Sequence, residues 1–354
     1  MDEEKNIEES ANTFIKSFFD ATYNDNKVLF NNMQNIYALI SFLYYNMQEL
    51  NIEKQDIQNG TRKDYVEKSK IIDNFYKSIN VDFKMEYITR NGVLNILSTN
   101  TPKEATHSQI YTGSNNYIIT EEAYTNPKTK ERIVLYRKLD KTINVHNNNL
   151  LNDSIIWVHE ISHYKNQPPE KRGEVNDILT ELIAYTEELI YTDYLSQIGY
   201  EEEARMFMIE EYKSLYHLIG LAYHIIKITF LYYLLGGVSK ENYLLLYKNN
   251  KDYNKALEIF DKEKNKNQNV IFLSLYYSVG IISFYNYIEY KKDQNFLEKI
   301  KKLNKEIITD ISLEEALKII NISLNEESLN RILENINIFR DSLLKENKKK
   351  KILN

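Results

Sequence analysis

Residues 153–163 read Asp153-Ser-Ile-Ile-Trp-Val-His-Glu-Ile-Ser-His163, and the interpretation of the whole chain starts from this stretch. Asp153 and Ser154 are good N-cap residues, and the apolar residues that follow recur at the spacing of a buried helix face. Residues four apart on a helix lie on one face, about 6 Å apart along its axis. His159 and His163 can therefore reach one metal ion, and we expect a helix that binds zinc.

Glu160 lies between the two histidines and projects roughly 100° round the helix from His159. From there it can reach a water on the metal, whose pKa zinc lowers to ~7, and accept its proton. This is the mechanistic content of the HExxH motif. The five-residue string alone occurs by chance in unrelated chains, so the prediction depends on finding a further ligand.

A catalytic zinc site needs a third protein ligand, which leaves the fourth position for water. The next predicted helix, at about residues 174–194, carries an acidic stripe made of Asp177, Glu181, Ala184 and Glu188. A loop with two prolines and a glycine would let this helix turn back across the first. We expect Glu181, at the centre of the stripe, to be the third ligand. The alternatives are Glu188, Glu187 and Glu174, while Asp177 and Glu188 are better placed to orient an imidazole N–H.

Composition favours a mainly α protein with a small β-sheet, because the 354 residues include only 9 glycines and 4 prolines. We expect one domain, with N-terminal helices over 1–82, the zinc-site and C-terminal helices over 151–344, and a frayed tail over 345–354. Between the helical parts, residues 83–150 should hold the small sheet. Four runs rich in β-formers lie there, at Phe83–Ile88, Tyr117–Thr120, Arg132–Tyr136 and Ile143–His146.

Charge and cysteine content exclude several classes of protein. Acidic and basic residues are interleaved, with a net charge of −6, so nothing predicts nucleic-acid binding. There are no cysteines, which excludes disulfides and thiolate metal sites.

The N-terminus is acidic and lacks a signal-like apolar run, and the apolar stretch around Leu218–Leu235 is interrupted by His224 and Lys227. We expect a cytoplasmic protein without a membrane span.

The zinc-site residues resemble the oligoendopeptidase F and thimet oligopeptidase family of zinc peptidases. The likeness lies in His159-Glu-Ile-Ser-His163 followed by Glu181-Leu-Ile-Ala-Tyr-Thr-Glu-Glu188, and, more weakly, in Tyr276-Tyr-Ser-Val-Gly280 and Ser312–Lys318. It implies a helical zincin-type metallopeptidase catalytic domain with one zinc ion per chain and short peptides as substrates. His159, His163 and Glu181 would be the ligands and Glu160 the base.

The same resemblance implies a tyrosine that stabilises the oxyanion. Tyr277 is the positional match, with Tyr276 and Tyr285 nearby. Ser162 stands where the family has glycine, no histidine directly precedes Tyr276, and the chain is shorter than typical members. His217 or His224 could substitute for that histidine, although a packed or partly exposed core histidine is the simpler interpretation of each.

We therefore expect a zinc-dependent endopeptidase or oligopeptidase that cleaves peptides through a water activated by Glu160. The strand Ile143–His146 is expected at a sheet edge, where an extended peptide could pair with it. The main alternative is a catalytically degenerate helical protein that binds a metal or peptides without cleaving them. A zinc hydrolase acting on a non-peptide amide is a third possibility with the same ligands.

Overall fold

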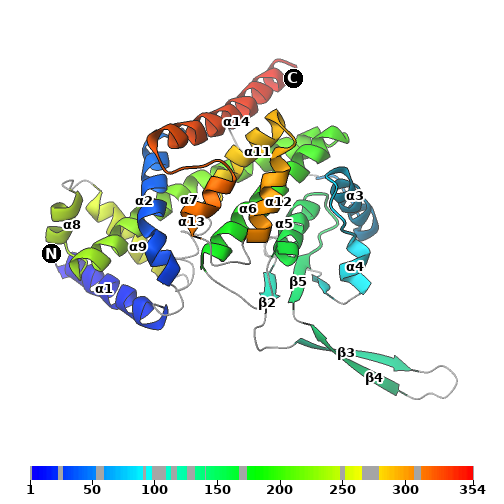
Figure 1. Cartoon of the computed structure of the whole chain (residues 1–354), viewed down its shortest axis with the longest axis horizontal. Helices are drawn as coiled ribbons and strands as arrows, with labels where there is room; N and C mark the ends of the chain where they lie inside the picture. The colour runs from blue at the N-terminus through cyan, green and yellow to red at the C-terminus, as the bar shows by residue number, and fades with distance from the viewer. Residues whose placement is uncertain are drawn as a thin grey trace. The chain divides into compact units, whose positions relative to one another are not determined.

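A computed structural model describes residues 2–22, 27–52, 60–90, 93–97, 109–112, 118–125, 132–139, 141–166, 174–247, 252–264, 279–306 and 312–353 (Figure 1). Its helices are α1 (Asp2–Thr22), α2 (Lys27–Asn46), α3 (Tyr65–Ser78), α4 (Met85–Arg90), α5 (Asp153–Asn166), α6 (Glu174–Gln197), α7 (Glu201–Leu235), α8 (Lys240–Tyr247), α9 (Tyr253–Lys264), α11 (Ile282–Lys292), α12 (Phe296–Glu306), α13 (Leu313–Ile319) and α14 (Glu326–Leu353). The mainly helical class predicted from the sequence is confirmed.

The chain divides into two compact units. The first comprises Met1–Glu53, Arg172–Thr186 and Met208–Asn354, and the second comprises Lys54–Lys171 and Glu187–Phe207. Helices α6 and α7 each contribute residues to both units. The single catalytic domain stays a prediction.

In the first unit, α11 is buried from Ile282 to Ile288 and packs against α14 (Figure 1). Phe284 of α11 stacks on Phe339 of α14 with ring centroids 4.4 Å apart, and Tyr212 of α7 lies 5.5 Å from Phe284. Such aromatic pairs contribute area burial and a favourable ring geometry. The short helix α13 begins directly after Ser312, whose hydroxyl accepts from the amide of Glu315 in a capping box.

In the second unit, α3 packs against α5 and presents one buried stripe, formed by Lys68, Ile72, Phe75 and Tyr76. Asp64 caps α3 through a capping box with Glu67. The same stripe also reaches α6, where the ring of Phe75 meets that of Tyr191 at a centroid distance of 5.0 Å. These contacts hold α5, the helix of interest for function, between α3 and the second half of α6.

The strands are β1 (Leu94–Leu97), β2 (Gln109–Thr112), β3 (Ile118–Thr125), β4 (Arg132–Leu139) and β5 (Lys141–His146). Antiparallel pairing joins β3 to β4, while β5 lies between β1, its parallel partner, and β2, its antiparallel partner. The expectation that Ile143–His146 forms a sheet edge is therefore wrong. Ile143 and Asn144 are paired on both sides within the chain, so an extended peptide cannot add to the strand there.

A second correction concerns Phe83–Ile88, which was predicted to be a strand. Residues Met85–Arg90 form helix α4 instead. The amide of Met85 at its start donates to the Asp73 carboxylate of α3 at 2.7 Å. This tertiary cap satisfies an amide that the first turn of a helix leaves without a partner, and it outweighs the β-propensity of the run.

The C-terminal tail is a third correction. Helix α14 runs on to Leu353, past residue 344, where the frayed tail was expected to begin. Lysine is a good helix former, so the lysine-rich end can extend an established helix at little cost.

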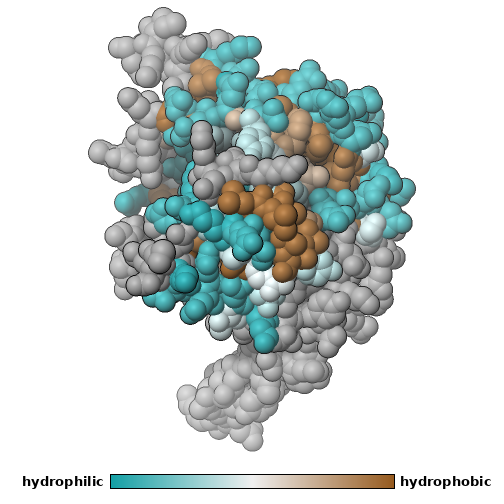
Figure 2. All heavy atoms as spheres, turned by 90° about the vertical axis from the view of Figure 1, so that its left-hand side faces the viewer, coloured by the Kyte–Doolittle hydropathy of each residue, from teal (hydrophilic) through white to brown (hydrophobic). Residues whose placement is uncertain are grey.

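Helix α7 is, among the described residues, the one long and apolar enough to cross a membrane by length and composition. More than half of its most apolar window is buried inside the molecule, and a core helix of a soluble protein passes the same test. Large apolar side chains are nevertheless exposed at its end and on α8, namely Leu234, Leu235, Leu244 and Leu245. Figure 2 views the side of the molecule that carries α8 and shows hydrophobic surface there among hydrophilic surface.

Candidate metal centre

The N-terminus of α5 is anchored by a buried ion pair. The Asp153 carboxylate lies 2.7 Å from the ammonium of Lys68, and it accepts the amides of Asn148 at 2.9 Å and Leu150 at 3.1 Å. Asp153 thus holds the loop that precedes the helix as well as its first turn. Sequence reasoning identified Asp153 as a cap but missed Lys68. A lysine inside the apolar stripe of α3 is the signal that could have predicted a buried partner.

The hydroxyl of the next residue, Ser154, both donates and accepts a hydrogen bond. It donates to the carbonyl of Leu151 at 2.6 Å and accepts from the Tyr191 hydroxyl of α6 at 2.8 Å. Both groups are buried, so these bonds fix the rotation of α5 against the second half of α6.

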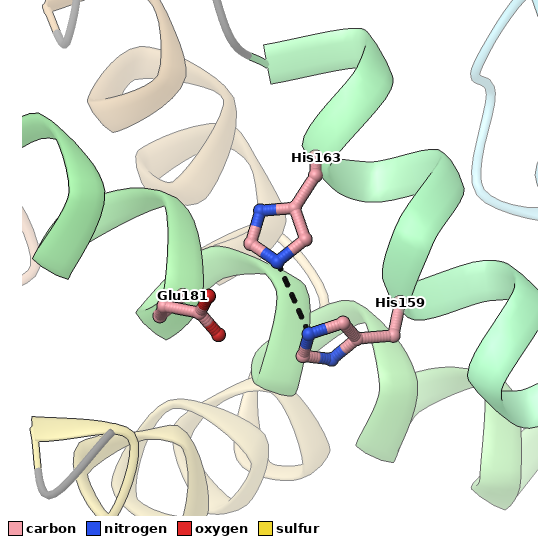
Figure 3. Close-up of side chains that lie close together, drawn as sticks. All are labelled: His159, His163 and Glu181. Atoms are coloured by element: carbon pink, nitrogen blue, oxygen red, sulfur yellow. Dashed lines mark hydrogen bonds between the residues drawn. The ribbon is translucent and has the colours of Figure 1, made fainter. Parts of the chain in front are cut away.

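One and a half turns further along α5, the two histidines of the motif face one another (Figure 3). The Nε2 atoms of His159 and His163 are 3.1 Å apart. Two nitrogens bound tetrahedrally to one zinc ion at 2.0–2.1 Å would be about 3.3 Å apart. The pair therefore has the separation that a shared metal ion requires.

Glu188 of α6 fixes the tautomer of His159. Its carboxylate lies 2.7 Å from His159 Nδ1, and its side chain is only 6% exposed. An ionised carboxylate only accepts hydrogen bonds, so Nδ1 carries the hydrogen and Nε2 keeps its lone pair for a metal. The sequence suggested this orienting role for Glu188, and the hydrogen bond agrees with it.

The neighbouring Glu187 has a different environment. Both of its oxygens accept from the Lys165 ammonium at 3.0 Å, and the Tyr76 hydroxyl donates to it at 3.3 Å. Lys165 also lies over the Tyr76 ring at 4.3 Å. Glu187 therefore joins the last turn of α5 to α3 and α6, and it is not the third ligand that the sequence left as an alternative.

Glu181, Glu174 and Asp177 are the other acidic residues of α6 that the sequence offered for the metal centre. His159, His163 and Glu181 offer ligand atoms that all lie within 4.8 Å of one another, and this group could hold a metal ion (Figure 3). Glu181 is the residue that the sequence favoured. The side chains of Glu174 and Asp177 lie outside the described part of the chain.

Glu160, the expected base, is on α5 beside the histidines and is 8% exposed. Tyr277 and Tyr276, the expected oxyanion donors, lie outside the described residues. Tyr285 is buried in α11, where its hydroxyl donates to the carbonyl of Ile320 at 3.4 Å. Burial raises the pKa of Tyr285 to about 12. This hydroxyl already has a partner in the protein core, which argues against a catalytic role.

Two further histidines of the described chain, His217 and His224, belong to α7. His224 of α7 is buried, and its Nε2 lies 3.4 Å from the Tyr44 hydroxyl of α2. His217 is exposed at the wall of a cavity. His146 ends β5 opposite Leu97, and His107 lies outside the described residues. The sequence predicted a packed or partly exposed core histidine at each of these two positions, and His224 is packed whereas His217 is exposed.

Comparison with known proteins adds little to this description. No family model matches the chain, and no curated protein matches it. The crystal structure of a putative oligoendopeptidase F from Bacillus anthracis str. Ames is similar, with 12% sequence identity and a TM-score of 0.48. The match covers 93% of this chain and 59% of that one, so the chain spans well under two thirds of that protein's length. A likeness of this extent does not identify a family.

Proposed function

We propose that this protein is a zinc-dependent peptidase that hydrolyses peptide bonds, with His159, His163 and Glu181 as zinc ligands and Glu160 as the base. The observation that carries the proposal is the pair of Nε2 atoms 3.1 Å apart, one of them on a ring that Glu188 orients through Nδ1. The Glu188 contact assigns the hydrogen of His159 to Nδ1, so the Nε2 lone pair of His159 faces His163 and is available to a cation.

The donor set fits zinc. Two imidazoles and one carboxylate form the ligand set of several catalytic zinc sites, and three protein ligands leave one position for water or substrate. The chain has no cysteine that could offer a thiolate alternative. The carboxylate that holds Nδ1 of His159 raises the basicity of that ligand and keeps its ring oriented.

A zinc ion bound here would polarise the scissile carbonyl and lower the pKa of a bound water to ~7. Glu160 would accept the proton of the attacking water and deliver it to the leaving amine. The side chain is buried beside the histidines, so bulk water would not compete for that proton. For the oxyanion we propose Tyr277, on the family resemblance of its segment alone.

The proposal is tested with purified protein and a Glu160→Gln variant. We expect about one zinc per wild-type chain by elemental analysis and cleavage of a mixed peptide library by mass spectrometry, abolished by a chelator. Glu160→Gln should keep the zinc and lose roughly 10²–10⁴-fold in cleavage rate, because the base is removed while the ligands remain. Glu210→Gln, an exposed site on α7, is the matched control and should cleave normally.

Each outcome has a definite interpretation. If the Glu160→Gln variant cleaved peptides at the wild-type rate, the mechanism would be overturned. Zinc retained by a wild-type protein that cleaves no peptide would favour the alternative of a degenerate metal- or peptide-binding protein. Absence of stoichiometric zinc would contradict the metal centre itself.

A further inference from the structure

The first unit contains a cavity of about 940 Å³ that the metal centre does not use. Its walls are the end of α2 with the segment that follows it, the middle of α7, and Lys255 of α9. All of these residues belong to the first unit. A volume of this size lies within the range of small-molecule binding sites.

Gly220 keeps one wall of this cavity open. It lies in the middle of α7, where glycine costs about 1 kcal/mol of helix stability relative to alanine. A Cβ at this position would meet no atom within 4 Å, so no packing contact requires a glycine. The residue weakens the helix and leaves space at the cavity wall, which is what a binding site needs.

The lining combines aromatic faces with an excess of positive charge. Tyr44, Tyr45 and Tyr216 supply rings and hydroxyls. Lys213 and Lys255 also line the cavity, and among its described lining residues Glu49 is the one carboxylate. The Lys213 ammonium donates to the carbonyl of Ile52, which fixes its position and leaves further N–H donors.

Behind the lining, the same face of α7 continues from Gly220 to His224 one turn later. His224 is 1% exposed, and its Nδ1 has no hydrogen-bond partner within the described part of the chain. The charged groups that influence its ring are Lys255, Asp252 and Lys227. Lys255 thus belongs both to the cavity lining and to the surroundings of His224.

We propose that this cavity binds a monocarboxylate with an apolar or aromatic body, through the ammonium groups of Lys255 and Lys213 and the tyrosine rings. The charge balance favours a carboxylate over a phosphate, because among the described lining residues two lysines and one glutamate leave a surplus of a single positive charge, with no arginine among them. Two sources share this chemistry, namely the free C-terminus of a peptide and a free aromatic acid.

The test measures binding by calorimetry in the Glu160→Gln background, so that no peptide probe is hydrolysed. The probes are N-acetyl-Leu-Tyr, its C-terminal amide, and 4-hydroxyphenylacetate. We expect the acid to bind about tenfold more tightly than the amide, since a charge-assisted hydrogen bond is lost with the carboxylate. Binding of 4-hydroxyphenylacetate as tight as that of the peptide acid identifies a free-acid site, and weaker binding identifies a peptide terminus.

Two pairs of variants locate the binding. Lys255→Met should remove the difference between acid and amide, while Lys302→Met, an exposed lysine of α12, should keep it. Gly220→Leu should project a side chain into the cavity and weaken binding of the acid at least about tenfold. Gly220→Ala controls for the loss of glycine in the helix and should retain binding. Thermal unfolding is used to check that both Gly220 variants fold.

Three results would overturn the proposal. The first is equal affinity for acid and amide. The second is acid binding that survives both Lys255→Met and Gly220→Leu, which would place the carboxylate elsewhere, such as at the zinc. The third is no binding of any probe up to about 10 mM.

Discussion

Replacing Lys68 by methionine should destabilise the second unit strongly, because it breaks the buried ion pair that anchors α5. Lys68 is 0% exposed and Asp153 is 7% exposed, and their charged atoms are 2.7 Å apart. The ammonium also lies 4.5 Å from the centre of the Trp157 ring. Methionine keeps the length and apolar stem of the side chain, so the change removes the charge without opening a large cavity.

The magnitude follows from what remains around Asp153. Removing one partner of a buried pair costs about 3–5 kcal/mol, because the other charge is left buried. Asp153 keeps the amides of Asn148 and Leu150 and the side-chain amide of Asn148 at 3.1 Å, and these bonds stabilise its carboxylate. The loss should therefore be near the lower end of that range, about 3 kcal/mol.

Urea unfolding followed by tryptophan fluorescence measures this loss directly. Trp157 is the only tryptophan, and it lies beside the pair on α5. We expect the midpoint to fall by about 1 M or more. Lys70→Met, an exposed lysine on the same helix, is the matched control and should change stability by less than about 0.5 kcal/mol. A loss below about 1 kcal/mol for Lys68→Met, or equal losses for both variants, would refute the reasoning.

Three further predictions concern other parts of the molecule. Glu188→Gln should lower zinc affinity about 10–100-fold in a chelator competition, because the carboxylate that orients His159 is lost. His224 has a pKa lowered to about 4, by burial first and then by Lys255 and Lys227, against an ordinary value of about 6.5. As pH falls below 6.5 the unfolded chain therefore takes up the proton first. Between pH 7 and pH 5 the free energy of unfolding should fall by about 2 kcal/mol more in the wild type than in His224→Gln. Gly199 follows α6 with φ +98°, so Gly199→Ala should lower the free energy of unfolding by about 1 kcal/mol despite open space for the methyl group.

Each of these has a contradicting result. Unchanged zinc affinity in Glu188→Gln would mean that the hydrogen bond does not orient a ligand. Parallel pH profiles for wild type and His224→Gln would contradict a neutral buried His224. A stabilised Gly199→Ala would mean that the turn accepts an L-residue in that conformation. Chemical denaturation at fixed temperature measures the last two.

The sequence predicted the local geometry well. Helix α5 and the facing histidines follow from a spacing of four residues, which a helix converts into one face whatever surrounds it. These features depend on neighbours in the chain, and so the chain alone can specify them.

The sequence failed where a distant residue decides local structure. Met85–Arg90 is helical because Asp73 of α3 receives the first amide, and no pattern within the segment records that contact. Strand β5 is not an edge because two segments from elsewhere in the chain pair with it. Lys68 was missed for the same reason, since its partner lies 85 residues away.

Two adjacent glutamates show most clearly what each level decides. The sequence by itself determined that the candidate metal centre has two imidazoles on one helix and a helix rich in carboxylates after it. It favoured Glu188 for orienting an imidazole, but it left both Glu187 and Glu188 as alternatives for the third ligand, because they are both acidic and one residue apart. Successive residues on a helix point about 100° apart, so the way α6 packs against α5 sends them to different partners. Tertiary structure places Glu188 on His159 Nδ1 and Glu187 on Lys165, and this packing separates an orienting carboxylate from one that joins helices.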